Sequence, residues 1–227
     1  MAKTYLELVN IVLRDINEVP LSEGTFTNAR GIQSFVKEAL NRSLLDIINY
    51  NDEWPFMANG PSQPGVRPQT HTFNTVSGVS EYMLPSGIDQ IDWDNILMIK
   101  PDNLDDVTKL EFISYNTVTR LGLQSGEPSC VYQTPSRTYI GLHPRPTKIY
   151  NIEYTAWKEP VILDLSTDTL PFEDRYYPVL VSRARYYLWM FRENSQQASI
   201  ALNEYEDSLR GMFRNLVNPD TNTMMAV

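Results

Sequence analysis

Two amphipathic helical regions at the ends of the chain enclose a central block with a different periodicity. The first region runs from Thr4 to Tyr50 and the last from Glu173 to Leu216, whereas most segments between them alternate apolar and polar residues. Spacings of three and four indicate helices, and alternation indicates half-buried strands. Neither end is long enough to bury its apolar stripe alone, so we expect the two ends to pack on each other. The sequence therefore predicts an α+β fold: a helical bundle built from both chain ends, with an inserted, mainly antiparallel β-domain.

Shifts in composition place the boundaries of these parts. The segment 58–69 holds three prolines and two glycines, which is typical of a linker or exposed loop. A second stretch, with Pro160 and several acids, returns the chain to its helical part. We predict a discontinuous bundle domain over 1–57 and 170–217, a β-domain over 70–157, linkers over 58–69 and 158–169, and a C-terminal tail over 218–227.

Start and stop signals divide each helical region into two helices. Thr4 and Glu7 have the spacing of a capping box. The clearest helical periodicity in the chain has Leu40 on its apolar face, and Trp54 and Phe56 follow it as an expected hydrophobic lid over the bundle end. The expected helices cover about 4–17, 28–50, 173–191 and 195–216.

The central block contains seven strand-like segments, at 70–75, 81–84, 95–100, 108–113, 129–133, 138–142 and 150–156. Ser77-Gly78 predicts a hairpin between the first two segments, and the turn at 134–137 predicts another. In the last segment Tyr150 and Ile152 share one face, which indicates a half-buried antiparallel strand. Tyr115–Leu121 suits either a short helix or a turn.

The charge balance argues against specific binding to DNA. The chain has 19 Lys and Arg against 28 Asp and Glu, a net charge of −9, and its basic residues form no cluster that would follow a phosphate backbone. A like-charged surface, in contrast, lets DNA pass without sticking. No apolar run approaches the ~18 residues of a membrane span, and we expect no signal peptide. Cys130 is the sole cysteine, which excludes an intrachain disulfide and fits assembly in a reducing cytoplasm.

Few residues have the spacing of a catalytic or metal site. His71 and His143 lack a partner three or four residues away that would suggest zinc. Cys130 and His143 lie on strands that a hairpin brings together, so a nucleophilic pair stays open beside the simpler interpretation of Cys130 as a small core residue. Carboxylates far apart in the sequence could also meet in space. We expect no catalytic, cofactor or metal site.

Two acidic sets and a basic set stand out. Asp89, Asp92 and Asp94 vaguely resemble a calcium loop but lack its glycine and its final glutamate, so a solvated loop is expected. The second set is Asp102, Asp105 and Asp106. The basic set lies on the C-terminal helices, either as a solvated face or as a docking face for an acidic partner; its members are Arg183, Arg185, Arg192, Arg210 and Arg214.

A series of motifs in a fixed order resembles a known family. The chain reads V-N-I-V-L-R-D-I-N-E-V-P-L-S, then a long helix, then N-Y-N-D-E-W-P-F, and later S-E-Y-M-L-P-S-G-I-D-Q-I-D and Y-I-G-L-H-P-R-P-T-K-I-Y-N-I-E-Y. This order resembles the tail tubular protein A family of short-tailed phages, the head-to-tail adaptors beneath the portal. The likeness covers most of residues 4–215, and the C-terminal tail falls outside it.

The resemblance implies a structural protein of the virion tail, assembled in the host cytoplasm. It implies a ring of twelve copies between the portal protein and the tail nozzle protein, with the helical part toward the portal and the β part toward the nozzle and the tail fibres. DNA would pass through the ring during genome ejection without specific binding. No enzyme activity, cofactor or membrane contact is implied. The alternative is a carbohydrate-binding or hydrolytic tail module, because the central block is rich in Tyr and Trp.

The expected contact residues follow from this interpretation. The fourth helix and the tail carry arginines and apolar residues that we expect to contact the portal or a neighbouring copy: Arg210, Phe213, Arg214, Met224 and Met225. Acids are expected to line the DNA passage, and the candidates are Asp89, Asp92, Asp94, Asp102, Asp105 and Asp106.

Overall fold

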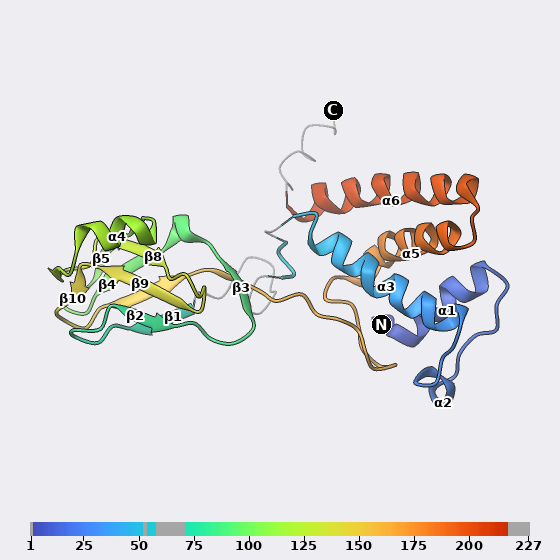
Figure 1. Ribbon diagram of the computed structural model, residues 1–227, viewed down its shortest axis with the longest axis horizontal. Coiled ribbons are helices and arrows are strands. Elements are labelled where there is room, and N and C mark those ends of the chain that lie inside the picture. Colours follow the sequence, from blue (N-terminus) through green and yellow to red (C-terminus); the bar gives the residue numbers. More distant parts are fainter. Residues whose placement is uncertain (1, 52–53, 58–70, 218–227) are drawn as a thin grey trace. The chain divides into compact units, whose positions relative to one another are not determined.

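The computed structural model describes residues 2–51, 54–57 and 71–217, and the chain divides into two compact units (Figure 1). A helical unit combines Met1–Phe56 with Pro160–Val227, and a β unit consists of Met57–Glu159. The predicted α+β class is confirmed. The predicted linker at 58–69 and the tail at 218–227 lie outside the described residues.

Helices from both ends of the chain build the helical unit (Figure 1). The N-terminal part supplies α1 (Tyr5–Asp15), α2 (Glu23–Phe26) and α3 (Ile32–Ile48), and the C-terminal part supplies the 3₁₀ turn η2 (Asp174–Tyr176), α5 (Tyr177–Phe191) and α6 (Ser195–Leu216). The predicted capping box is present: the Glu7 amide donates to Thr4 Oγ1 at 3.3 Å, and the Thr4 amide donates to the Glu7 carboxylate at 2.9 Å. The short helix α2 was not expected, because its four residues cover little more than one turn.

The core of the helical unit joins residues far apart in the sequence. Helix α3 packs against α5, and α5 packs against α6. The fully buried leucines of this core come from both chain ends: Leu8, Leu13, Leu40, Leu44, Leu180 and Leu188. The prediction that the two ends share one core is therefore confirmed for the described residues.

An aromatic cluster closes the C-terminal end of α3. Trp54 is completely buried, and its indole N–H donates to the Ile47 carbonyl at 2.8 Å. Its ring stacks on Phe56 and meets the edge of Phe213 from α6, with ring centroids 5.2 and 6.0 Å apart. The predicted hydrophobic lid is confirmed, and Phe213 joins it.

The segment between the β unit and α5 is fastened to the helices. The side-chain amide of Asn41 donates to the Leu163 carbonyl at 2.8 Å, and the Leu163 amide donates back to the Asn41 side chain at 2.9 Å. The Tyr5 amide donates to the Asp168 carbonyl at 2.7 Å. Residues 160–169 are thus a structured part of the helical unit, although their composition suggested a linker.

The β unit contains two four-stranded sheets. One is antiparallel, in the order β1 (His71–Asn74), β11 (Asn151–Tyr154), β4 (Leu97–Lys100) and β5 (Asn103–Lys109). The other has the order β2 (Glu81–Met83), β9 (Tyr139–His143), β8 (Cys130–Gln133) and β6 (Glu111–Phe112), and its β6–β8 pair is parallel.

Two short strand pairs and two helical turns complete the β unit. Strand β3 (Ile88–Ile91) pairs with β12 (Ala156–Lys158), and β7 (Ser125–Gly126) pairs with β10 (Arg145–Pro146). The helical turns are η1 (Trp93–Asn95) and α4 (Tyr115–Leu121). The ambiguous segment is thus a helix, and the Ser114 hydroxyl caps it by accepting from the Thr117 amide at 3.2 Å.

The core of the β unit draws on both four-stranded sheets. Buried residues alternate along β11, where Ile152 and Tyr154 point inward, as predicted. The cluster contains Ile91, Ile96, Met98, Leu110, Val131, Ile140, Leu142, Tyr150, Ile152, Tyr154 and Ala156. The two ends of the unit meet, because the amide of Lys158, its next-to-last residue, donates to the Met57 carbonyl at 2.8 Å.

One predicted hairpin is wrong and the other is right. Gly78 does occupy a turn with φ +81°, but the flanking strands β1 and β2 belong to different sheets. The Tyr82 hydroxyl holds this turn by donating to the Val79 carbonyl at 2.8 Å, so the chain crosses from one sheet to the other. The turn at 134–137 joins β8 to β9 as an antiparallel hairpin, as expected.

Leu40→Ala tests the shared core of the helical unit. Leu40 is completely buried, so the truncation leaves a cavity and is expected to lower the free energy of unfolding by ~2–5 kcal/mol. Urea denaturation followed by circular dichroism measures the loss. Ile200→Ala, at a residue of α6 that is 46% exposed, is the control and is expected to change little. Equal losses for the two variants would contradict the shared core.

Gly141→Ala tests the packing of the second sheet. A Cβ on Gly141 would lie 2.1 Å from the Tyr132 ring on the neighbouring strand, so the buried ring must move. We expect a loss of ~1–3 kcal/mol in unfolding free energy. Gly126→Ala is the matched control in the same unit, because its Cβ would meet only Pro144 at 3.8 Å. A Gly141→Ala variant as stable as this control would show that Tyr132 does not constrain the position.

Candidate functional site

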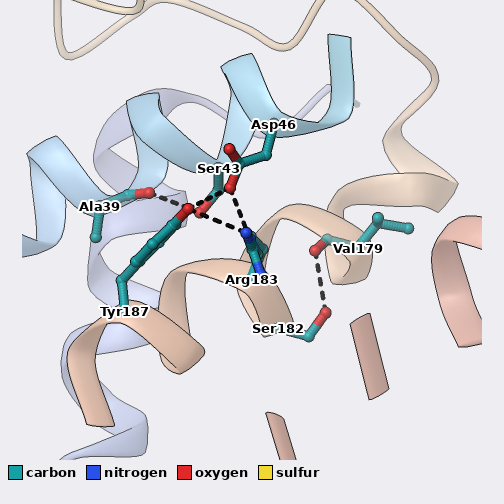
Figure 2. Close-up of polar contacts among 7 residues, drawn as sticks. All are labelled: Ala39, Ser43, Asp46, Val179, Ser182, Arg183 and Tyr187. Atoms are coloured by element: carbon teal, nitrogen blue, oxygen red, sulfur yellow. Dashed lines mark hydrogen bonds and ion pairs between the residues drawn. The ribbon is translucent and has the colours of Figure 1, made fainter. Parts of the chain in front are cut away.

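Two arginines of α5 and the arginine directly after it bind acids from other elements of the helical unit. Arg183 donates to Asp46 of α3 at 2.7 Å, and its guanidinium lies 4.8–4.9 Å from the rings of Tyr186, Tyr187 and Tyr205. Figure 2 shows Arg183 and Tyr187 of α5 reaching the same carboxylate, to which the Tyr187 hydroxyl also donates. Arg183 therefore links α5 to α3 and, through Tyr205, to α6.

The electrostatics of this cluster favour the charged arginine. Burial alone lowers the pKa of Arg183, but the hydrogen bond and the charge of Asp46 outweigh this effect, so the net pKa is raised. Burial and the Asp46 hydrogen bond both raise the pKa of Tyr187, which keeps the phenol protonated. Ser43 and Ser182, buried on the facing helices, each donate to a carbonyl of their own helix.

Arg185 of α5 and Arg192, the residue that follows α5, also bind within the unit. Arg185 contacts Glu204 of α6 at 2.9 Å and Asp15 of α1 at 3.8 Å, and Arg192 contacts Glu18 at 2.7 Å. Arg183, Arg185 and Arg192 thus each form an ion pair with an acid from another element of the same chain. This pairing favours the interpretation of these three arginines as structural over the docking face.

The C-terminal end of α6 differs from α5. The Arg210 side chain is 63% exposed, and its ion-pair partners among the described residues are Glu206 and Asp207 of its own helix, at 3.5 and 3.8 Å. Arg214 is exposed and forms no ion pair with any residue that the structure describes. Phe213 is half-buried against Trp54 and against Tyr50, whose ring centroid is 5.8 Å away. Met224 and Met225 lie outside the described residues.

The candidate passage acids do not form one cluster of equivalent groups. Asp92 is half-buried and caps η1, where it accepts from the Asp94 amide at 3.1 Å and from the Asn95 side chain at 2.6 Å. Asp106 binds Lys100 at 3.1 Å. The exposed members are Asp89, Asp94 and Asp102. The side chain of Asp105 lies outside the described part.

The histidines and the cysteine occupy structural positions. His71 stacks on Tyr154 with ring centroids 5.3 Å apart, and burial lowers its pKa. Cys130 and His143 are directly opposite each other on β8 and β9, but the polar contact of the thiol is the Ser129 hydroxyl at 3.6 Å. Among the described residues, no three His, Cys, Asp or Glu side chains gather into a possible metal site. No described helix is long and apolar enough to cross a membrane.

Two exposed apolar surfaces were missed in the sequence. The first lies in residues 160–169, where Ile162 and Leu165 are 62% and 63% exposed. The second, which we call the β-unit apolar surface, consists of Phe112, Tyr115, Leu121 and Leu123 around α4. Low charge with exposed aromatic and aliphatic side chains is typical of a protein interface. The available signal was the density of apolar residues, in a segment interpreted as a linker for the first surface and in a strand and a short helix or turn for the second.

Asp46→Asn tests the Arg183 cluster. The substitution leaves a half-buried guanidinium without its carboxylate, and we expect the free energy of unfolding to fall by ~1–3 kcal/mol. The matched control is Glu206→Gln, which disrupts the exposed pair with Arg210 and should change stability by less than ~0.5 kcal/mol. Thermal or urea unfolding measures both. Similar losses would show that Arg183 needs no partner on α3.

Comparison with known proteins agrees with a structural role in a phage. No match was found among curated proteins. The SU10 adaptor protein family matches residues 3–226, which is nearly the whole chain and includes both units. This match supports the resemblance to phage head-to-tail adaptors, which are in general virion components without enzymatic activity. The chain belongs to the SU10 adaptor protein family.

Proposed function

We propose that copies of this chain form an adaptor ring that joins the portal to the tail nozzle and leaves a passage for the genome. The family match across both units is the single observation that carries this proposal. The division of the chain supports it, because each unit has its own core and its own exposed apolar side chains. Two independent surfaces suit a protein that connects two different partners.

The helical unit is the proposed portal side and the β unit the proposed nozzle side. On the helical unit, the candidates for contact with the portal or with a neighbouring copy are Arg210, Phe213 and Arg214 at the end of α6, together with Met224 and Met225. On the β unit, the β-unit apolar surface is the proposed contact with the nozzle or the tail fibres. Its members lie in the segment 112–123, whose only charged residue is Arg120, so desolvating this surface costs little.

The proposed passage is acidic. Twelve copies at −9 each carry a charge of about −108, and part of that charge facing the passage would keep DNA from adhering. The exposed carboxylates of Asp89, Asp94 and Asp102 are the best candidates, since Asp92 and Asp106 already bind groups of their own chain.

The alternative of a carbohydrate-binding module has weaker support than the adaptor role. It rested on the Tyr and Trp residues of the central block, of which Tyr132, Tyr150 and Tyr154 are at most 5% exposed, while Tyr115 and Tyr139 are 41% and 37% exposed. Rings that are buried in a core offer no stacking platform for a sugar.

Electron microscopy of the purified protein, alone and with the portal protein of the same phage, tests the proposal. We expect rings of the chain, either free or seated on the portal, and a chain that is detectable in purified virions by mass spectrometry. A chain that stays monomeric in both samples and is absent from virions would refute the adaptor role. Image classes that show twelvefold symmetry would also establish the copy number.

A further inference from the structure

The end of α6 is a surface that is both apolar and positively charged. It is formed by Tyr50, Arg210, Phe213 and Arg214, and we call it the basic surface. Tyr50 is 51% exposed, and residues 209–217 contain two arginines and no acid. The Arg214 side chain donates to the Arg210 carbonyl at 3.4 Å, so the two arginines lie one helical turn apart. The acids nearest in the helix, Glu206 and Asp207, contact Arg210 alone.

A second surface of the same unit is apolar and negatively charged. It is formed by Glu38, Ile162, Asp164 and Leu165, and we call it the acidic surface. Ile162 and Leu165 are 62% and 63% exposed, and both carboxylates belong to exposed residues. Neither carboxylate forms an ion pair with any residue in the described ranges.

The acidic surface is built on a fixed backbone. The Asp168 carboxylate accepts from the amides of Asp164 and Leu165 at 2.7 and 2.8 Å, and Asn41 holds Leu163 from the side of α3. The Tyr5 hydroxyl donates to the Lys37 carbonyl of α3 at 2.8 Å and accepts from the Asn41 side chain at 3.2 Å. Because Asn41 also binds Leu163, the turn of α3 that carries Glu38 lies beside the segment that carries Asp164. Burial has the largest effect in raising the pKa of the Tyr5 hydroxyl, and both carboxylates raise it further. Exposed apolar side chains on a rigid segment need little ordering when a partner binds.

We infer that the basic surface of one copy binds the acidic surface of the next copy. The two surfaces match in charge, and each offers apolar side chains that stay exposed in a single chain. They are different surfaces, so the contact is head-to-tail, and a head-to-tail contact repeated with a closing rotation makes a ring. Figure 1 shows α6 along one edge of the helical unit and the gold segment that precedes α5 along the opposite edge. The inference rests on the proposed ring and specifies how its copies are joined.

Charge reversal on one surface at a time gives the first part of the test. One variant combines Arg210→Glu with Arg214→Glu, and the other combines Glu38→Arg with Asp164→Arg. Each variant alone places like charges across every contact, and we expect the concentration for half-assembly to rise at least ~10-fold. Sedimentation velocity measures free rings, and electron microscopy measures rings on portal protein. In one molar salt, the concentration for half-assembly of each variant should lie closer to that of the unmodified protein, because salt screens the repulsion.

Mixing the two variants gives the decisive part. In a ring where the two variants alternate, half of the contacts join the acidic α6 end of one variant to the basic segment of the other. The other half join an unmodified basic surface to an unmodified acidic surface, so every contact is attractive. We expect an equimolar mixture to assemble as well as the unmodified protein, whereas neither variant assembles alone. Circular dichroism and the melting temperature establish that each variant is folded, since all four positions are exposed.

The control variant combines Arg14→Glu with Arg30→Glu. Both arginines are exposed in the helical unit and lie outside the two surfaces, and the change in net charge equals that of the α6 variant. We expect this control to assemble normally. Loss of assembly in the control, normal assembly of either single variant, or failure of the mixture would each overturn the inference.

A variant of the α6 end that forms free rings but no longer binds portal would assign the basic surface to the portal instead. Unmodified protein that forms no ring, free or on portal, would refute the adaptor proposal and this inference together.

Discussion

The contact between α3 and α5 is the constraint on which the helical unit depends. It joins parts of the chain that are 137 residues apart at the Asp46–Arg183 pair, and the whole β unit lies between them in the sequence. Neither helix buries its apolar face without the other. The helical unit therefore requires both ends of the chain, and its folding involves long-range contacts, which slow folding compared with a bundle of neighbouring helices.

Long helices with strong periodicity were the most predictable elements. The capping box at Thr4, the burial of Leu40 and the lid formed by Trp54 all follow from local spacing and side-chain chemistry, and all are present. Short elements were not predictable in the same way. Strands such as β7 and β10 contain only two residues each, so tertiary contacts rather than intrinsic β-propensity determine where they form. The turn at Gly78 was recognised, but a turn does not determine which strands pair on either side of it.

The arginines show why a site is harder to predict than a fold. Arg183, Arg185 and Arg192 resemble Arg210 and Arg214 in the sequence, yet the first three bind acids from α3, α1, α6 or the loop after α1. The partners lie up to 174 residues away, so only the packing of the helices separates structural arginines from exposed ones. The exposed apolar residues at 160–169 were missed for a related reason. Loops are usually polar, and an apolar loop is recognised as a surface only once its neighbours are known.

The hydrogen bond between Lys158 and Met57 makes the β unit a module with adjacent ends. An inserted domain whose two ends meet does not distort the domain that contains it, because the helical unit needs to supply only two neighbouring attachment points. A short flexible bridge could then replace the insert without stretching the helical unit. The same geometry lets the two units diverge separately, so that a change on the surface of the β unit need not disturb the core of the helical unit.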